Sequence, residues 1–237
     1  MLAGMFAPRA VTPPVAFAQW LGAIGTADNT QATSHNVSMP ATVSAGDLLI
    51  MQFATSAAVG ITHTTPSGWS LLLTNVGAIA GGSSFRSSIF YKIANGSEGG
   101  TQVSVAVSAS VRRAAIVNRI AAGTFDTAAP LSGSSVYVAA TPNPDPPVHS
   151  PPWGAGKTLW IVGYGQRNSP GSSFVVQYPY PQGNTLARTP STGTAYVHTA
   201  SCVVDSETAS LDPGAFGSGI STGGSCVGFT LAVRPAS

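Results

Sequence analysis

A strand–turn–strand pattern over residues 46–99 limits what this chain can fold into more than any other feature of the sequence. An apolar run over residues 47–55 follows a glycine turn and stops well before the turn of residues 65–68, which Trp69 follows directly. A second strand-like run, residues 88–94, ends in another turn. Short apolar runs between Gly, Pro and Asn turns are typical of strands. A buried strand, a tight turn backed by a large aromatic side chain and a returning strand predict the nucleus of a β-sandwich.

Strand-like patterns continue through most of the chain. Val103, Val105 and Val107 alternate with small polar residues, which predicts a half-buried antiparallel strand. Helical signal is limited to one turn at residues 211–216. We therefore expect an all-β fold, an antiparallel jelly-roll-like β-sandwich with a non-regular N-terminal arm. The predicted strands cover residues 35–39, 47–55, 61–64, 69–74, 84–94, 101–108, 112–121, 156–162, 175–179 and 227–234.

The length of 237 residues suits one large β-domain. We expect an N-terminal attachment arm, residues 1–22, followed by a single sandwich, residues 23–237. The sandwich is predicted to consist of two halves, about 23–123 and 132–237. The Pro-rich residues 141–152 have the composition of a stiff extended loop, and we expect them to cross from one half to the other.

The second half of the chain echoes the first. Residues 156–159 (Gly-Lys-Thr-Leu) resemble residues 46–49 (Gly-Asp-Leu-Leu), and both precede an apolar strand-like run. Two Gly- and Ser-rich stretches, residues 180–194 and 205–224, are predicted to be loops at the ends of the sandwich.

The N-terminal arm is apolar but is broken by prolines at positions 8, 13 and 14, which disfavours a helix or a paired central strand. Such a segment cannot bury its own side chains, so we expect it to dock on another subunit or on its own domain. Residues 16–18 (Ala-Phe-Ala) resemble a cleavage site, but the prolines and Arg9 interrupt the apolar region, so we expect no signal peptide. The predicted attachment residues are Leu2, Met5, Phe6, Val15, Phe17 and Trp20.

Charged residues make up only 8% of the chain, against about 25% in ordinary soluble domains. This leaves two alternatives: a surface rich in hydroxyl and amide groups, or a surface largely covered by partner subunits. The net charge is +2 and the arginines are scattered, with Arg113 and Arg119 on one strand face and Arg112 on the other, so no nucleic-acid partner is expected. The apolar runs stop short of the roughly 18 residues of a membrane span, so no membrane insertion is expected.

Two cysteines do not make a disulfide framework. Cys202 and Cys226 would lie nearly opposite each other if residues 195–204 and 225–234 paired as neighbouring strands. The favoured alternative is two buried thiols in a reducing compartment.

No pattern of catalytic, metal-binding or cofactor-binding residues stands out, and we expect no enzyme activity. Residues 154–158 (Gly-Ala-Gly-Lys-Thr) resemble the end of a phosphate-binding loop, but a required glycine is Pro151 and a strand-like run follows. Among the eight acids only Asp205, Glu207 and Asp212 gather in one stretch, and their irregular spacing favours a solvated turn over a Ca²⁺ site. Distant residues could still be brought together by the fold.

Four tryptophans and the Tyr178-Pro179-Tyr180 segment could provide platforms for sugar binding. We assign Trp69 and Trp160 to the core because of the turn and the apolar strand around them. Trp153 and Tyr180, on predicted loops, are the possible glycan-binding residues.

An ordered set of motifs resembles the jelly-roll appendage proteins of tailed bacteriophages and gene-transfer agents, which form tail fibres, head fibres or spikes, and capsid decorations. The resemblance covers about residues 28–235. Its motifs are Gly46-Asp47-Leu48-Leu49-Ile50, Pro66-Ser67-Gly68-Trp69, Phe90-Tyr91-Lys92-Ile93-Ala94 with Gly96-Ser97-Glu98, and Thr230-Leu231-Ala232-Val233-Arg234-Pro235.

This resemblance implies a virion structural protein on the outside of the particle, assembled in the bacterial cytoplasm. Its partners would be capsid or tail proteins and further copies of itself, with a trimer favoured. The family has no shared catalytic residues, so none is carried over. The alternative is a lectin-like module that recognises host-surface glycan, and a polysaccharide-degrading enzyme is the third candidate.

Overall fold

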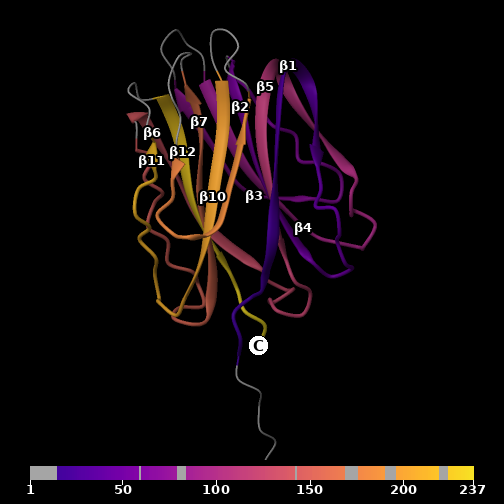
Figure 1. Cartoon of the computed structure of the whole chain (residues 1–237), viewed down its shortest axis with the longest axis vertical. Helices are drawn as coiled ribbons and strands as arrows, with labels where there is room; N and C mark the ends of the chain where they lie inside the picture. Colours follow the sequence, from indigo (N-terminus) through magenta and orange to yellow (C-terminus); the bar gives the residue numbers. More distant parts are fainter. Residues whose placement is uncertain are drawn as a thin grey trace, which may run out of the picture.

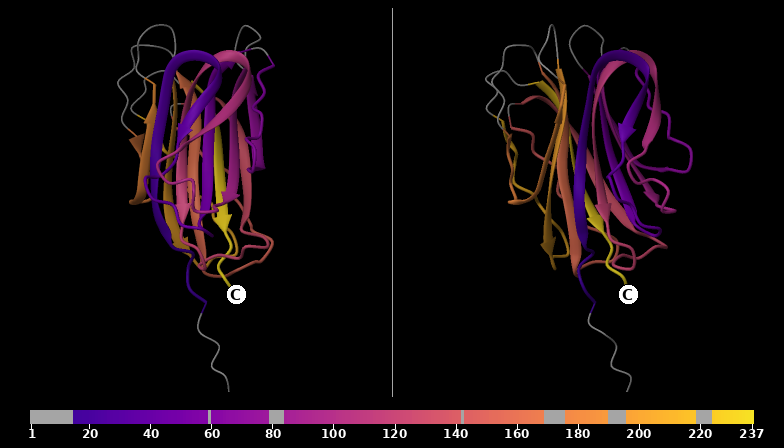
Figure 2. Two further views of the ribbon diagram at one scale, coloured as in Figure 1. Left: turned by 90° about the vertical axis from the view of Figure 1, so that its right-hand side faces the viewer. Right: turned by 45° about the vertical axis from the view of Figure 1, so that its right-hand side comes forward.

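The computed structural model describes residues 15–58, 60–78, 84–141, 143–168, 176–189, 196–218 and 224–237. All regular elements in these ranges are strands, and they form two antiparallel five-stranded sheets that face each other (Figure 1). The predicted all-β sandwich is therefore confirmed. Its body consists of two layers of strands that run along the long axis of the molecule (Figure 2).

Each sheet is built from one half of the chain. The first sheet has the order β1-β5-β2-β4-β3 and the second the order β6-β12-β7-β10-β9. Jelly-roll connectivity is not confirmed by this arrangement. The first-sheet strands are β1 (Trp20–Ser38), β2 (Leu48–Ala58), β3 (Ser70–Ala78), β4 (Ser84–Ile93) and β5 (Gln102–Ile120). The second-sheet strands are β6 (Leu131–Thr141), β7 (Thr158–Asn168), β9 (Gln182–Arg188), β10 (Tyr196–Ser206) and β12 (Gly224–Val233), while the short β8 (Val176–Gln177) and β11 (Gly217–Ser218) pair with each other.

The two sheets have the same strand order, so the chain contains a topological repeat. With the two short strands left aside, β1 to β5 correspond in sequence to β6, β7, β9, β10 and β12. Contacts between the sheets come in matching pairs that follow this correspondence. The contact of β1 with β9 has its counterpart in the contact of β6 with β3, and the contact of β5 with β10 has its counterpart in that of β12 with β4. This reciprocal pattern is that of a two-fold symmetric interface formed within one chain.

The sequence echo at residues 46–49 and 156–159 marks corresponding strands, β2 and β7. Leu48 and Leu159 both face the interior between the sheets, beside Ile120 and Val233 of the neighbouring strands. The inward leucine follows its turn glycine by two residues in the first half, from Gly46 to Leu48, and by three in the second half, from Gly156 to Leu159. Because side chains alternate between faces, that one-residue difference is required for both leucines to point inward.

Two glycines in β7 make room for close contacts, Gly163 with its own sheet and Gly165 with the opposite sheet. A Cβ atom on Gly163 would lie 2.5 Å from the carbonyl oxygen of Ala200 and 2.4 Å from the ring of Phe229. A Cβ atom on Gly165 would lie 2.9 Å from Cβ of Ala54 in the opposite sheet. These positions therefore leave room only for hydrogen.

The first sheet bends back over its own outer face. The β1–β5 ladder has register shifts between Asp28 and Ser34, and the two strands bend over together at the end opposite the C-terminus (Figure 2). Residues 32–38 and 102–108 thereby cover the outer face of β2. The resulting core contains Val37, Met39, Leu49, Met51, Phe53, Phe90, Val105, Val107 and Trp69. The predictions of a half-buried strand at residues 101–108 and a core position for Trp69 are confirmed.

The start of β1 differs from the prediction. The first strand was expected at residues 35–39 and the arm at residues 1–22, but β1 already begins at Trp20. The signal was weak because small residues replace an apolar alternation here. They are needed for contact with β9, since a Cβ atom on Gly25 would lie 2.7 Å from the carbonyl oxygen of Leu186.

The Pro-rich residues 141–152 do not cross between the halves, contrary to the prediction. The connection from β5 to β6 is residues 121–130, and the Pro-rich segment lies on the outer face of the second sheet. Thr230 Oγ1 donates to the Pro147 carbonyl at 2.6 Å, and the Phe216 amide donates to the Pro144 carbonyl at 2.8 Å. A proline segment suits this place because it covers a face without needing ladder partners.

Three predicted elements are wrong in detail. Residues 180–194 were expected as a loop but contain β9. This edge strand was not predicted because its residues are mostly polar or exposed and show no apolar alternation. Residues 61–64 form only an isolated bridge from His63 to Val107, and the strand at 175–179 shrinks to β8. Because β7 lies between β10 and β12, Cys202 and Cys226 are not on neighbouring strands, and both are free and buried.

Substitution of Gly163 by alanine should destabilise the protein by about 1–3 kcal/mol, because its Cβ would overlap backbone that cannot move independently. Chemical denaturation of the full chain measures this. Gly156→Ala is the matched control: no atom lies within 4 Å of a Cβ there, and its stability should change by less than about 0.5 kcal/mol. Equal effects of the two substitutions would contradict the tight packing of Gly163 against Ala200 and Phe229.

Candidate functional site

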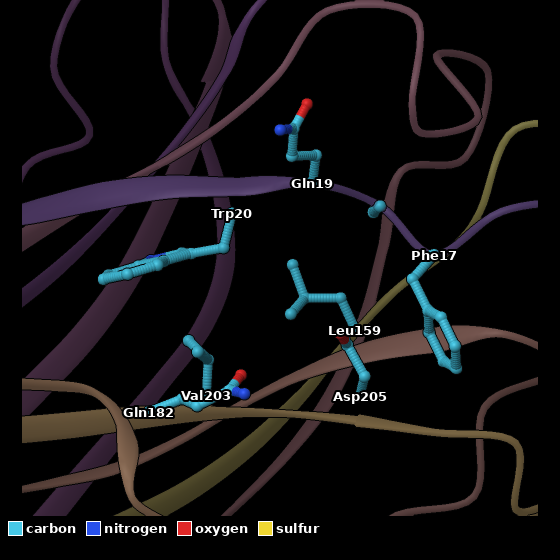
Figure 3. A pocket seen from close by; sticks show the side chains of 8 residues that line it. Phe17, Gln19, Trp20, Leu159, Gln182, Val203 and Asp205 are labelled. Carbon is cyan, nitrogen blue, oxygen red and sulfur yellow. The ribbon is translucent and has the colours of Figure 1, made fainter.

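A pocket lies at the end of the molecule where the chain enters β1, between the edge of the first sheet and the second sheet (Figure 3). Its volume is about 260 Å³. The lining residues come from the segment before β1 and from β1, β7, β9 and β10: Phe17, Ala18, Gln19, Trp20, Leu159, Gln182, Val203 and Asp205.

The segment that forms one wall is held firmly to the domain. Ala18 is buried in the core between the sheets, and Trp20 packs against the same core. The backbone amide of Gln19 donates to Thr124 Oγ1 at 3.0 Å, and the backbone carbonyl of Gln19 accepts from the Ala121 amide at 2.9 Å. These contacts fix the direction in which the chain enters β1.

The ring of Trp20 is positioned from both sheets. Its Nε1 donates to Asn118 Oδ1 at 3.1 Å. Gly183, the second residue of β9, has a φ of 65°, a backbone conformation that favours glycine. A Cβ atom at this glycine would lie 3.3 Å from Cζ2 of Trp20 and 2.8 Å from Cγ2 of Val203. Gly183 therefore lets β9 approach the ring and close that side of the pocket.

The polar part of the pocket consists of Asp205 and the carboxamide of Gln182, which lie across from the two aromatic rings in Figure 3. Burial raises the pKa of the Asp205 carboxyl above its usual value. At the rim, Lys157 Nζ lies 5.9 Å from the centroid of the Phe17 ring. The arrangement combines apolar walls with one acidic group, which is typical of small-ligand sites.

The predicted attachment residues are divided between two regions. Leu2, Met5 and Phe6 lie outside the described residues. Val15 is exposed, and Phe17 and Trp20 are half-buried and line the pocket. Of the two docking alternatives for this segment, packing on its own domain applies from Ala18 onward.

The predicted glycan-binding residues do not line the pocket. Trp153 Nε1 donates to Thr158 Oγ1 at 3.1 Å, and the Arg234 guanidinium lies 5.9 Å from its ring centroid. Tyr180 packs on the core at the outer face of the second sheet, where burial raises the pKa of its hydroxyl. Both side chains are thus engaged in contacts of their own domain.

Three acids of the described part of the chain form ion pairs: Asp47 with Arg119, Glu98 with Lys92 and Asp126 with Arg234. Asp28 Oδ2 lies 3.4 Å from Nδ1 of His35, whose pKa is lowered by burial. Asp47 and Glu98 also bind the backbone of turns. Asp47 accepts from the Ser44 and Ala122 amides at 2.7 and 3.0 Å, and Glu98 accepts from the Asn95 and Gly96 amides. Hydrogen bonds and ion pairs lower the pKa values of both carboxyls against the opposing effect of burial.

Among the described residues, no three acids, histidines or cysteines lie close enough together to hold a metal ion. The same part of the chain contains no helix long and apolar enough to span a membrane.

Two histidines fasten the covering layers to the sheets. His63 bridges Thr55 Oγ1 and Ser88 Oγ through its two ring nitrogens, at 2.9 Å each. His149 bridges Ser132 Oγ and Ser134 Oγ at 2.8 and 2.9 Å. Burial lowers the pKa of both rings, to about 3 for His63. They are placed as neutral structural groups rather than as acids or bases for catalysis at neutral pH.

Sequence reasoning missed the pocket because its walls come from four separate strands and the segment before β1. Asp205 was noticed only as one of three acids in a loop, and Gln182 not at all. Gly183, directly after Gln182, was a usable signal for a close approach of backbone.

Comparison with known protein families, with curated proteins and with solved structures gave no match. The resemblance to phage appendage proteins therefore stays a prediction.

The stability of the fold should decrease in mild acid. Burial lowers the pKa of all four histidines below 6.5, to about 3 for His63 and His198. Such a group takes up its proton first in the unfolded chain, so its contribution is fully present above about pH 6.5 and is lost as the pH falls toward the folded pKa. Urea denaturation should show the free energy of unfolding falling between about pH 7 and pH 5, by up to about 1.4 kcal/mol per pH unit for each neutral histidine.

The variant His63→Gln is the control for this pH dependence, because glutamine can donate and accept hydrogen bonds without titrating. The slope of its free energy of unfolding against pH should correspond to the uptake of about one proton fewer on unfolding. A flat profile in the wild-type chain from about pH 7 to pH 5 would show that the histidines titrate freely.

Trp20→Ala should destabilise the domain by about 2–3 kcal/mol, because Trp20 packs on the core between the sheets and donates to Asn118. Thermal or chemical denaturation measures the change. The control is Val15→Ala, at a side chain that is 43% exposed, with an expected change below about 0.5 kcal/mol. If both substitutions were neutral, the pocket wall would not be part of the folded domain.

Proposed function

We propose that this protein is a structural subunit on the exterior of a bacteriophage particle, a tail fibre or a head fibre or decoration, attached through its N-terminal segment. The observation that carries the proposal is the place where the chain enters the domain. The indigo segment before β1 and the C-terminus lie at the same end of the sandwich (Figures 1 and 2). Attachment at that end would leave the opposite end pointing away from the particle.

The closed construction of the sandwich supports a role as a rigid building block. The outer face of the first sheet is covered by its own bent strands, and that of the second sheet by the Pro-rich segment and its neighbours. The edge strands also meet in pairs, β1 with β9 and β3 with β6. Covered edges protect a subunit that is present in many copies from uncontrolled strand pairing.

The use of charged groups also favours a structural role over polysaccharide cleavage. A glycosidase needs two carboxyl groups that converge across one bond. Here Asp47, Glu98 and Asp126 hold turns and ion pairs instead. The lectin-like alternative gains no support from Trp153 and Tyr180, since both are engaged within the domain.

Deletion of residues 2–14 tests the proposal. It removes Leu2, Met5 and Phe6 but keeps Ala18 and Trp20, which belong to the core, so the domain should keep its wild-type melting temperature. Particles produced with the truncated protein as the sole source should lack it, as measured by mass spectrometry of purified virions.

A Gly/Ser replacement of residues 2–14 at equal length is the matched control, since it separates the need for side chains from the need for length. It should also fail to incorporate. Normal incorporation of either variant would refute attachment through this segment, and absence of the full-length protein from particles would refute the virion role itself.

A further inference from the structure

Asp205 is the one acid among the residues that line the pocket, and its carboxylate has no ion-pair partner among the described residues. Within the described part of the chain, no lysine, arginine or histidine nitrogen lies within 4.0 Å of its carboxylate, whereas four other acids have such partners. Asp205 lies near the end of β10 and lines the pocket (Figure 3). The Asp205 side chain is exposed, so its carboxylate is accessible to a ligand that carries a positive charge.

The rest of the pocket is suited to an organic cation. Aromatic rings attract cations over their faces within about 6 Å. The ring of Phe17 already receives Lys157 Nζ at 5.9 Å, which shows this interaction at the rim. Leu159 lies between the two rings, Val203 lies on the side of Trp20 that faces Gln182 (Figure 3), and both offer contact to a short aliphatic chain.

The size of the pocket limits the ligand. A volume of about 260 Å³ is below the range of roughly 300–1,000 Å³ that is usual for drug-sized ligands. A group of a few heavy atoms is therefore appropriate. An ammonium has three N–H donors. These could bind the Asp205 carboxylate, the side-chain carbonyl oxygen of Gln182 and water.

We propose that this pocket is a binding site for an organic cation, a primary ammonium or guanidinium on a short apolar chain. Asp205 would pair with the charge, Trp20 and Phe17 would contact it through their rings, and Leu159 and Val203 would contact the chain. The site is independent of the role in the particle, and it would remain if that role were refuted.

Titration of the full-length protein with n-butylammonium chloride tests the site, in phosphate buffer so that no other amine is present. Backbone amide shifts of residues 157–159 and 182–205 in NMR spectra report the binding. We expect saturable binding in the millimolar range, and about tenfold weaker binding for Asp205→Asn. Asp205→Asn should fold with about the wild-type melting temperature, because the side chain is exposed and has no ion-pair partner to lose among the described residues.

Two controls make the result specific. Asp212→Asn removes an acid that is not among the pocket residues and should bind like the wild type. Neutral n-butanol has nearly the same shape as the ammonium ion and should bind at least about tenfold more weakly. Equal binding of n-butanol, equal binding by Asp205→Asn, or no saturation up to about 100 mM would overturn the proposal.

Discussion

Burial of the central strands on both faces is the constraint on which this structure depends. Leu48 and Ile50 of β2 face the second sheet, while Leu49, Met51 and Phe53 face the other way and are buried as well. In β7, Leu159 and Ile161 face inward, and Trp160 and Val162 are buried on the outer face. A two-layer sandwich covers only one face of each sheet. Each half of the chain therefore has to supply an additional covering layer.

The two halves solve this problem in different ways despite their common strand order. In the first half, β1 and β5 continue past their bend and return over the outer face as paired strands. In the second half, segments outside the sheet cover the outer face, with prolines among them. Each covering layer is fastened by a histidine that bridges two hydroxyl groups, His63 in the first half and His149 in the second. Burial keeps these rings neutral and makes the fold sensitive to acid.

The end of the sandwich where the chain enters combines the features that bear on function. Residues 18–20 are bound to the core, so the chain enters β1 at a defined point with a defined direction. The pocket lies beside that point, and Asp205 is the one acid that lines it.

The all-β class, the positions of most central strands and the core role of Trp69 and Trp160 followed from the sequence, because apolar runs between Gly and Pro turns depend on local pattern alone. Even the echo between residues 46–49 and 156–159 was visible, and it marks corresponding strands. Tertiary structure alone decided how the strands are shared between the sheets, where β1 begins and what the Pro-rich segment covers. Gly25, Gly163 and Gly183 carry no apolar signal, yet contacts with residues far away in the chain require them. The pocket was hidden for the same reason: Trp20, Gln182 and Asp205 become neighbours only when strands from both halves pack together.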